Sequence, residues 1–503
     1  MAPHFANEIP SHLLMWRRVR EYAVPPSMIE NSTARRAVGD WAGACAAARV
    51  HVDLDLRAVR RRHGTPVVTL LREDLRRLAP DLLRWHMPRI APDGRLRPGL
   101  TLSLARYGSA GGTPLHLVVR TPPAWADGGQ WMSLALWEGS GNGTPGDHPH
   151  GHHPHPHPER RFRLDLHRHL WDAGRSNELT ARCGAGKAPP HDSPWAEGSW
   201  AVEAELLLRA ERLPRGAFTV RLGARRRAVL ELVAPDDSHL PTLRALPEGV
   251  LPPQEVAALP VLPEAAARVL PDLELLRTGL IPPERLHPLV AAALAGYGSA
   301  PVGGPVPEPG DPHRVECRGE THRIALRDGV LTAVDHDPAQ LRREELLVAL
   351  GGPPLPCLRA IDSVHRDPEA LPAVRERLRH GDATGALAVV EGLLGPGAVL
   401  RDGPLREELE QAAARHVDHG LFRSGLVAVH PAAGTAGSAD IPGGTGGAGG
   451  SGGTGGAGGS GGVGGSGAGR VKAGHRPRLD RSTPLPLRSK LIGRSRPRTS
   501  QAS

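Results

Sequence analysis

The feature that most limits how this chain can fold is a glycine-rich run near its C-terminus. Residues 443–469 repeat as Gly-Gly-X triplets without proline, which excludes a collagen triple helix. Such a segment has almost no side chains to bury and cannot offset the entropy of ordering its backbone. We therefore expect residues 434–469 to form a disordered Gly-rich linker, and we expect every folded domain to precede it.

The linker leads into a disordered basic tail at residues 470–503. The tail holds ten basic residues and one acid, Asp480, so it accounts for the whole net charge of +9 and leaves the rest of the chain neutral. Because no aromatic residues are interleaved to stack on bases, only non-specific, salt-screened binding to a polyanion remains. A merely solvated tail is the alternative. The candidate polyanion contacts are Arg470, Lys472, Arg476, Arg478, Arg481, Arg488, Lys490, Arg494, Arg496 and Arg498.

Composition also separates the N-terminal part of the chain from the rest. All nine tryptophans lie in the first 200 residues, and such large rings usually anchor a core. The core after residue 240 must then be built from Leu, Val and Ala. At 503 residues the chain is too long for one core, which predicts two or three folded units. Lysine occurs only three times, which indicates a GC-rich genome of bacterial type and makes the arginine excess poor evidence for phosphate recognition.

Residues 8–235 are predicted to hold N-terminal helices followed by an antiparallel β domain. Helices are expected at Ser11–Tyr22 and Ser27–Ala48, which lack internal proline and are rich in helix formers, and at Val67–Leu78, where apolar residues recur at spacings of three and four. From residue 100 the period changes to two, most clearly in Phe162–His167. Several short strands separated by turns favour an antiparallel β-sandwich or a barrel-like region. The predicted strands are 100–105, 115–119, 131–137, 162–167, 202–208, 218–222 and 228–233.

Residues 236–312 are rich in proline and are predicted to form a connector with two helices, at 264–277 and 283–297. A C-terminal domain with a β-hairpin and a helical bundle is expected over 313–430. Within it, two Asp-Pro pairs have the N-cap and first-turn pattern that starts a helix. These pairs are Asp337-Pro338 and Asp367-Pro368. The fold class is therefore α+β, with several domains.

The four cysteines are far apart in the sequence and form no Cys-x-x-Cys motif, so we predict reduced thiols and no zinc site among them. A dinucleotide fingerprint, a phosphate-binding loop and a kinase triplet are each matched only in part and are rejected. The sequence therefore favours a non-catalytic protein. The cysteines are Cys45, Cys183, Cys317 and Cys357.

Histidine gives the one metal hypothesis that the sequence supports. A His- and Pro-rich loop spans residues 147–158, and an imidazole-rich segment can bind Zn²⁺ or Ni²⁺, although a plain loop expansion explains it as well. Just downstream, Asp165, His167 and His169 would share one side of the strand predicted at 162–167. A solvent-facing polar side is the alternative, since Arg161 and Arg163 continue it. The loop histidines are His148, His150, His152, His153, His155 and His157.

The N-terminus lacks the apolar core of a signal peptide, and no apolar run is long enough to cross a bilayer, so we expect a cytoplasmic protein. We expect a non-catalytic interaction or scaffold protein whose partner is another protein. Trp125, Trp131 and Trp137 could form an apolar patch for that partner, but core packing explains them better. One alternative is a metal-binding protein or metal-dependent hydrolase that uses His167 and His169. A second is polyanion binding through the tail.

Overall fold

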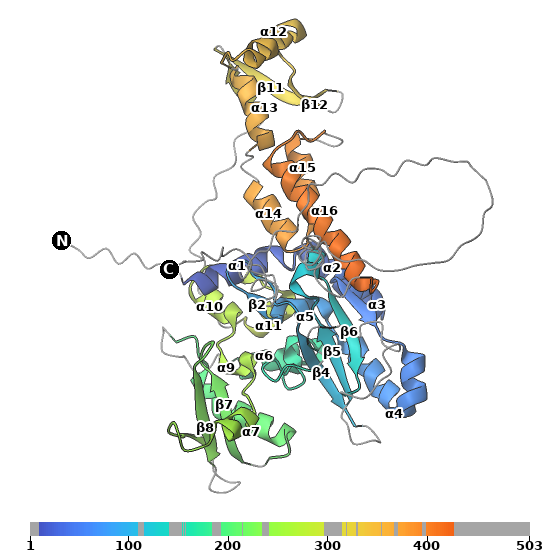
Figure 1. Cartoon of the computed structure of the whole chain (residues 1–503), viewed down its shortest axis with the longest axis vertical. Coiled ribbons are helices and arrows are strands. Elements are labelled where there is room, and N and C mark those ends of the chain that lie inside the picture. The colour runs from blue at the N-terminus through green and yellow to red at the C-terminus, as the bar shows by residue number, and fades with distance from the viewer. Residues whose placement is uncertain are drawn as a thin grey trace, which may run out of the picture.

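The computed structural model arranges the chain before the linker around four β-sheets with helices between and around them (Figure 1). The predicted linker and basic tail, with all ten candidate polyanion contacts, lie outside the described residues, as do His148, His150 and His152. The structure describes residues 10–108, 115–139, 153, 155, 157–183, 193–213, 215–233, 241–295, 314–317, 319–327, 330–353, 355–366, 371–394 and 399–426.

The largest sheet has four strands in the order β1-β6-β5-β4. β1 runs parallel to β6, and the other neighbours are antiparallel. The last three of these strands were predicted, but β1 lies in a region that the sequence describes as helical. The strands are β1 (Val50–Asp53), β4 (Thr101–Tyr107), β5 (Leu115–Arg120) and β6 (Met132–Trp137).

The N-terminal helices pack against this sheet, and their apolar stripes form its core. α1 has the predicted bounds, whereas the predicted helix Ser27–Ala48 is broken at Gly39, whose φ of +78° is left-handed, and by the Asp40 cap that follows. The predicted helix Val67–Leu78 is the second half of α4, after a break at Gly64. The helices are α1 (Ser11–Tyr22), α2 (Pro26–Ala37), α3 (Trp41–Ala47), α4 (Leu56–Arg77) and α5 (Pro80–His86).

The strand predicted at Phe162–His167 is wrong. Phe162 and Leu164 are buried as the alternation implies, but the segment turns back on itself and meets β4 only at a single bridge between Arg163 and Ser103. The alternation of apolar and polar residues in this segment therefore indicates that every second side chain is buried. It does not indicate a hydrogen-bonded strand. A short 3-10 turn (Arg168–Leu170) follows.

The strand predicted at 202–208 is also wrong, because this segment is part of the helix α7. Trp200, Ala204, Leu207 and Leu208 are buried together, which is the spacing of a helix. They cover a three-stranded antiparallel sheet, β7-β8-β9, that forms a separate small core. The elements are α7 (Trp200–Ala210), β7 (Gly216–Arg221), β8 (Arg227–Val233), β9 (Thr242–Ala245), α8 (Pro253–Ala258) and α9 (Glu264–Ala267).

The predicted sandwich or barrel is therefore not what forms. The four-stranded sheet and the β7-β8-β9 sheet have separate cores, and neither closes on itself. A two-stranded hairpin of β2 (Arg89–Ile90) and β3 (Arg95–Leu96) lies between α5 and β4 in the sequence. The coarser prediction, an α+β fold, agrees with the structure.

The segment predicted as a connector contributes to the N-terminal core. Leu275, Leu276 and Val290 pack in the same cluster as the first helices and the main sheet. Proline interrupts both helices predicted here, so that each becomes two shorter pieces. The second pieces are α10 (Pro271–Arg277) and α11 (Pro288–Ala293).

The C-terminal unit has the predicted hairpin and helices. β11 pairs with β10 and with β12, Asp337 caps α12 through the amide of Ala339, and Leu371, Val374 and Leu378 are buried. The predicted start at Asp367-Pro368 lies outside the described residues. The elements are β10 (Arg314–Cys317), β11 (Glu320–Arg327), β12 (Val330–Ala333), α12 (Pro338–Ala349), α13 (Pro356–Arg366), α14 (Leu371–Arg379), α15 (Ala383–Leu394) and α16 (Pro404–Arg423).

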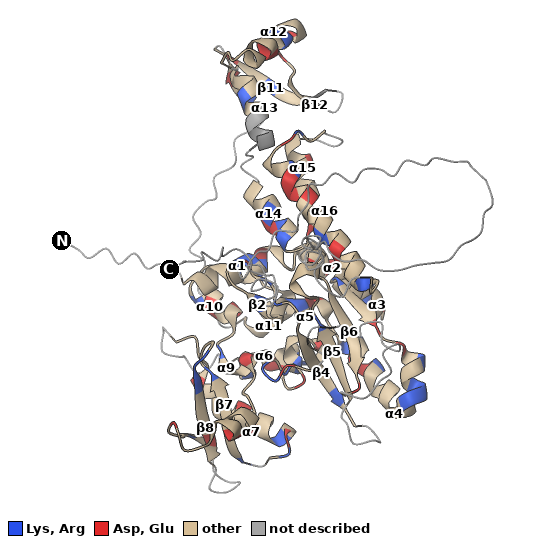
Figure 2. Cartoon of the chain, in the orientation of Figure 1, with Lys and Arg blue, Asp and Glu red and all other residues tan. Residues whose placement is uncertain are grey.

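Among the described helices, none has both the length and the apolar character needed to cross a membrane. Acidic and basic side chains are interspersed over the folded body (Figure 2). α4 is an exception, since it presents several exposed arginines on its outer side. These are Arg57, Arg60, Arg61, Arg62, Arg72, Arg76 and Arg77.

Candidate metal centre

The structure does not bring Asp165, His167 and His169 together as a ligand set. The Asp165 carboxylate accepts two hydrogen bonds of 2.9 Å from the Arg163 guanidinium. The rings of His167 and His169 stack with centroids 5.7 Å apart. Within the described part of the chain, these residues belong to no group of three whose ligand atoms all lie within 4.8 Å of one another.

The environment of His167 is also unfavourable for a cation. The side chain is buried, and desolvation, followed by the charge of Arg182, lowers its pKa to about 3. Arg182 itself forms two hydrogen bonds of 2.6–2.7 Å with Glu203. A divalent ion here would face arginines whose carboxylate partners are already engaged.

Of the His-rich loop, His153, His155 and His157 are described. His153 Nε2 lies 2.9 Å from the carbonyl oxygen of Thr121, and burial lowers the pKa of its ring to about 4. His157 contacts the ring of Trp137 edge-on, with centroids 6.1 Å apart. These histidines therefore pack onto the main sheet, and they do not form a ligand group in the described part of the loop.

A different group of side chains converges in the C-terminal unit. The ligand atoms of Cys317, His336 and Cys357 all lie within 4.8 Å of one another. All three residues are buried, with exposed fractions of 0%, 8% and 0%. Tetrahedral zinc with bond lengths of about 2.0–2.3 Å places its ligand atoms about 3.3–3.8 Å apart, so small side-chain rotations would suffice to close the site.

A fourth residue, His322, lies against this group. Its ring stacks on that of His336 with centroids 4.0 Å apart and an angle of 14° between the planes. His322 is 7% exposed, and its Nδ1 has no hydrogen-bond partner. The strand pattern of β11 places it on the covered face, where Ile324 is buried, so it occupies a position that an apolar side chain would normally fill.

The local sequence explains how these residues meet. Cys317 ends β10 and pairs with Glu320 at the start of β11, across a tight turn that uses the left-handed conformation of Gly319 (φ +85°). This turn brings Cys317 and His322 onto neighbouring strands. Cys357 enters from the first turn of α13, which packs against β10 and β12.

His336 is held in place by the residue before it. The Asp335 carboxylate accepts hydrogen bonds from both the backbone amide and the guanidinium of Arg323 in β11. These bonds lower the pKa of Asp335 to about 2. On the other side of His336, Asp337 caps α12. The turn that carries His336 is therefore tied to both the sheet and the next helix.

The surroundings of the cysteines suit a structural metal. The two thiols lie in a small core with Ala333, Leu341 and Leu355. Burial, followed by the hydrogen bond to Cys317, raises the pKa of the Cys357 thiol to about 11. A bound cation would reverse this effect, because a coordinated thiol is deprotonated.

The sequence predicted no zinc site formed by the four cysteines among themselves. The structure brings two of them, Cys317 and Cys357, together with a histidine. Closely spaced cysteine pairs are absent here, because the members of this group are distributed over the strands β10 and β11, the turn after β12 and the helix α13. One usable signal was present, since Gly319 stands between Cys317 and His322 in the sequence, where a turn can bring the two together.

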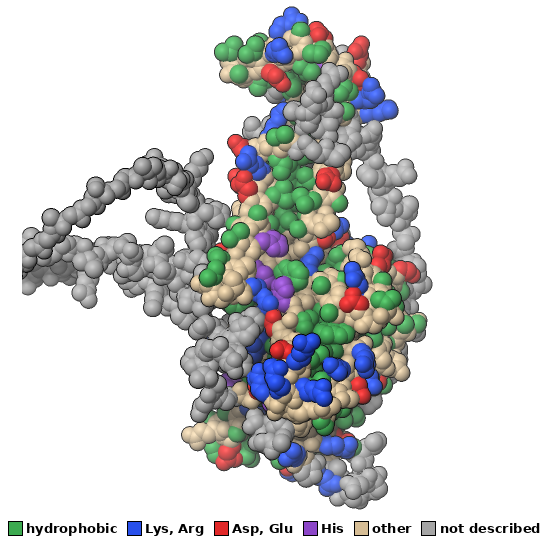
Figure 3. All heavy atoms as spheres, turned by 90° about the vertical axis from the view of Figure 1, so that its right-hand side faces the viewer, with side chains coloured by type: hydrophobic (Ala, Val, Ile, Leu, Met, Phe, Trp, Pro, Cys, Tyr) green, Lys and Arg blue, Asp and Glu red, His purple; other side chains and the backbone are tan. Residues whose placement is uncertain are grey.

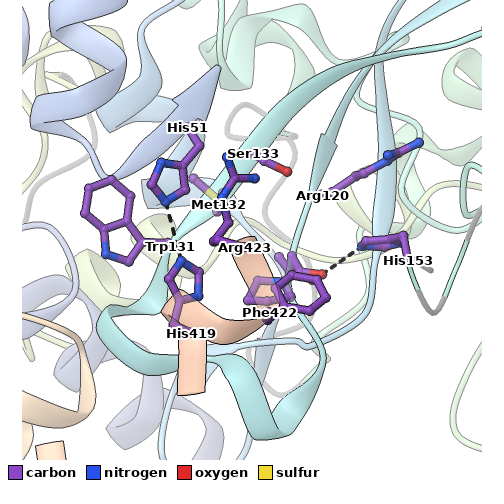
Figure 4. A pocket seen from close by; sticks show the side chains of 11 residues that line it. His51, Arg120, Trp131, Met132, Ser133, His153, His419, Phe422 and Arg423 are labelled. Carbon is purple, nitrogen blue, oxygen red and sulfur yellow. Dashed lines mark hydrogen bonds between the residues drawn. The ribbon is translucent and has the colours of Figure 1, made fainter. Parts of the chain in front are cut away.

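A second group of histidines, which includes His51 and His419, lies where α16 packs against the 3-10 turns Ala124–Ala126 and Gly128–Gln130. Figure 3 shows histidine side chains gathered on one face of the molecule. His419 Nδ1 of α16 lies 2.8 Å from the carbonyl oxygen of Ala126, and its ring stacks near that of His51 at 5.7 Å. His51 in turn stacks on Trp131 at 4.3 Å (Figure 4). The hollow between them holds only about 20 Å³, room for little more than one water molecule.

The helix α16 also covers two of the tryptophans that were considered as a patch for a partner. Phe422 meets Trp125 edge-on at 5.8 Å, and Arg423 forms a two-pronged ion pair of 2.8–2.9 Å with Asp53. Trp125 and Trp131 are thus packed against a helix of their own chain. They do not form an open patch for another protein.

Comparison with protein-family models, with curated proteins and with solved structures finds no match for this chain.

Proposed function

We propose that Cys317, His322, His336 and Cys357 bind one Zn²⁺ as a closed, structural site, and that the protein is a zinc-stabilised interaction protein. The observation that carries this proposal is the convergence of two thiols and an imidazole within 4.8 Å inside a buried core. The ring of His322 lies face to face with that of His336 and would have to rotate out of this stack to become the fourth ligand. Two Cys and two His ligands form a common structural zinc set, and thiolates favour zinc over nickel at such sites.

The burial of the ligands argues for a structural role. A catalytic zinc site keeps one position open to water and substrate. Here the four side chains are at most 8% exposed, which leaves no such opening. The alternative of a hydrolase at His167 and His169 has less support, since their surroundings are cationic and their rings are not joined by a third ligand.

A metal would also supply stability that the local core lacks. The cluster around the cysteines contains five buried residues, which is little for a hairpin and two helices. Structural zinc contributes about 10–16 kcal/mol in small folds that depend on it. The centre would therefore fasten α12 and α13 to the hairpin.

The interaction part of the proposal is supported by α12. Leu346, Leu347 and Leu350 at its C-terminal end are 62%, 49% and 88% exposed. Exposed leucines this close together are typical of a protein-binding surface. The hairpin unit that carries them stands away from the main sheet (Figure 1).

The test is cobalt substitution of the full chain after removal of bound metal. Tetrahedral Co²⁺ with thiolate ligands gives ligand-field bands in the visible and sulfur charge-transfer bands in the near ultraviolet, which the His-rich loop cannot produce. We expect one equivalent of Co²⁺ with both signals, and displacement of that ion by Zn²⁺.

Variants then locate the site. Cys317→Ser and Cys357→Ser should each abolish the charge-transfer bands or reduce them strongly, and His322→Ala should weaken zinc binding by at least about tenfold. Cys183→Ser, at a cysteine outside the cluster, should leave both unchanged. Spectra without a sulfur band, or an undiminished band in both cluster variants, would contradict the proposal.

A further inference from the structure

A second, larger cavity lies beside α1, and none of the four proposed zinc ligands lines it. It encloses about 330 Å³ between α1, the β2–β3 hairpin, the 162–183 segment and α9–α10. This volume is in the range of small-molecule binding sites, about 300–1,000 Å³. α1 and α10, which form one wall, are packed side by side (Figure 1).

One part of the wall is apolar. Met15 and Trp16 from α1, Met87, and Phe162 and Leu179 from the opposite segment line the cavity. Such a surface fits an aromatic or branched hydrocarbon body and excludes a fully hydrated ion.

The other part of the wall is cationic. Six arginines line the cavity, against two carboxylates, Glu264 and Glu274. Four of these arginines already have a carboxylate within 4.0 Å. The four pairs are Arg20–Asp272, Arg163–Asp165, Arg182–Glu203 and Arg268–Glu264.

The remaining two are Arg89 and Arg97, which have no carboxylate within 4.0 Å among the described residues. Arg89 is 6% exposed and donates only to carbonyl oxygens, including a bond of 2.6 Å to Arg84, while its Nε has no partner. Arg97 also has an unpartnered, buried Nε. The two come from one hairpin, in which Arg89 pairs with Leu96 and the amide of Arg97 donates to the carbonyl of Pro88. Successive positions of a strand face opposite ways, so Arg89 and Arg97 line different parts of the wall.

A buried guanidinium without an anion is costly, and a ligand carboxylate can accept two parallel hydrogen bonds from one guanidinium. Burial, followed by the charge of Arg20, lowers the pKa of Arg89 to about 9. The neutral imidazole of His169, 5% exposed with an unpartnered Nδ1, adds a polar contact in the same cavity.

We propose that this cavity binds a small amphipathic carboxylate, with its acid group on the half-buried guanidinium of Arg97 and its apolar body against Trp16 and Phe162. A dianionic phosphate fits less well, because Glu264 and Glu274 share the wall with this cation. One cation among these carboxylates therefore matches a monoanion.

The probe is 1-naphthaleneacetate, compared with the neutral 1-naphthaleneacetamide and with 1-naphthyl phosphate, each titrated calorimetrically into the full chain. We expect the carboxylate to bind at least about tenfold more tightly than the amide, because it gains charge-assisted hydrogen bonds. Equal binding of the amide, tighter binding of the phosphate, or no binding of any of the three at millimolar concentration would overturn the proposal.

Arg97→Gln is the deciding variant because Arg97 is only half-buried, so its loss should be tolerated by the fold. It should weaken the carboxylate at least about tenfold and the amide little. Arg97→Lys, which keeps the charge but not the planar fork, should weaken the carboxylate as well. Arg227→Gln, at an exposed arginine outside the cavity, is the matched control and should change nothing. A carboxylate affinity unchanged in Arg97→Gln, in a protein that melts like the parent, would show that the cavity is not the site.

Discussion

Arg20 and Asp272 form an ion pair whose side chains are 1% and 0% exposed. Two hydrogen bonds of 2.7–2.8 Å join them, and the indole of Trp85 donates to the same carboxylate. This pair connects α1 to α10 across 252 residues of sequence. This buried ion pair therefore fixes a segment that was predicted as a connector to the N-terminal core.

Asp272→Asn should therefore destabilise the protein by about 3–5 kcal/mol, because it leaves the Arg20 cation buried without its anion. The free energy of unfolding in urea measures this loss. Glu205→Gln breaks the exposed pair with Arg209 and should cost less than about 0.5 kcal/mol. Similar losses in the two variants would contradict the difference in burial.

The buried histidines give the stability of the fold a definite pH dependence. Desolvation lowers the pKa of His86, His116 and His153 to about 4 and that of His167 to about 3. In the unfolded chain these groups titrate near 6.5. Their folded pKa values are depressed, so their full contribution is present above pH 6.5 and is lost as the pH falls toward 4.

Unfolding free energies measured from pH 7.5 to 4 should therefore fall continuously below pH 6.5. His167→Leu should flatten this slope, since each pKa unit corresponds to about 1.4 kcal/mol and His167 has the lowest pKa of the four histidines. His63→Leu, at a half-buried histidine beside Glu138, is the control and should leave the slope below pH 6.5 no flatter. A slope in His167→Leu equal to that of the parent would contradict this prediction.

At the scale of single elements, periodicity predicted the type of structure where one face is buried. The bounds of α1 and the buried stripe of α14 follow from the sequence, and so do β7 and β8. It failed where two periods fit the same residues. In α7, the apolar residues from Val202 to Leu208 are dense enough to satisfy either period, and packing on the β7-β8-β9 sheet selects the helix.

The candidate site was less predictable than the elements that carry it. The hairpin of β11 and β12 and the cap at Asp337 could be predicted from the sequence, and the cap positions His336. The pairing of β10 with β11, which positions Cys317, was not predicted. The approach of Cys357 depends on how α13 packs against the hairpin, which is a tertiary contact. Local patterns carry no information about such contacts.

The docking of α16 depends on a glycine pair in the turn before β6. A Cβ atom at Gly128 would lie 2.1 Å from the carbonyl oxygen of Arg415 in α16. Gly128→Ala should therefore push the helix away and destabilise the protein by about 1–3 kcal/mol. Hydrogen exchange of the α16 amides should rise at the same time.

The control for this prediction lies on the same helix. Gly420 has open space around it, so Gly420→Ala should leave docking intact and stabilise the helix by about 0.5–1 kcal/mol. Faster exchange in this variant, or unchanged exchange in Gly128→Ala, would show that the contact does not hold α16.

At the scale of the whole molecule, the charge of the tail is separate from the neutral body. If the tail contacts polyanions, changing Arg494, Arg496 and Arg498 to Gln in the full chain should reduce the slope of log affinity against log salt by about 2.7, or about 0.9 per contact. Fluorescence anisotropy with a DNA duplex measures this slope. Changing Arg57, Arg60 and Arg61 of α4 to Gln is the matched control. An equal decrease of the slope in this control would indicate that polyanions contact the folded body.

Because the chain is synthesised from its N-terminus, the tryptophans that α16 covers stay exposed until that helix has been made. Trp125 and Trp131 leave the ribosome roughly 300 residues before the helix that covers them, a delay of about 15–60 s at 5–20 residues per second. During that interval the nascent main sheet presents aromatic surface to the cell. Chains that terminate before α16 would keep this surface open permanently, so we expect them to aggregate or to be held by chaperones, whereas the full chain shields itself once α16 has docked.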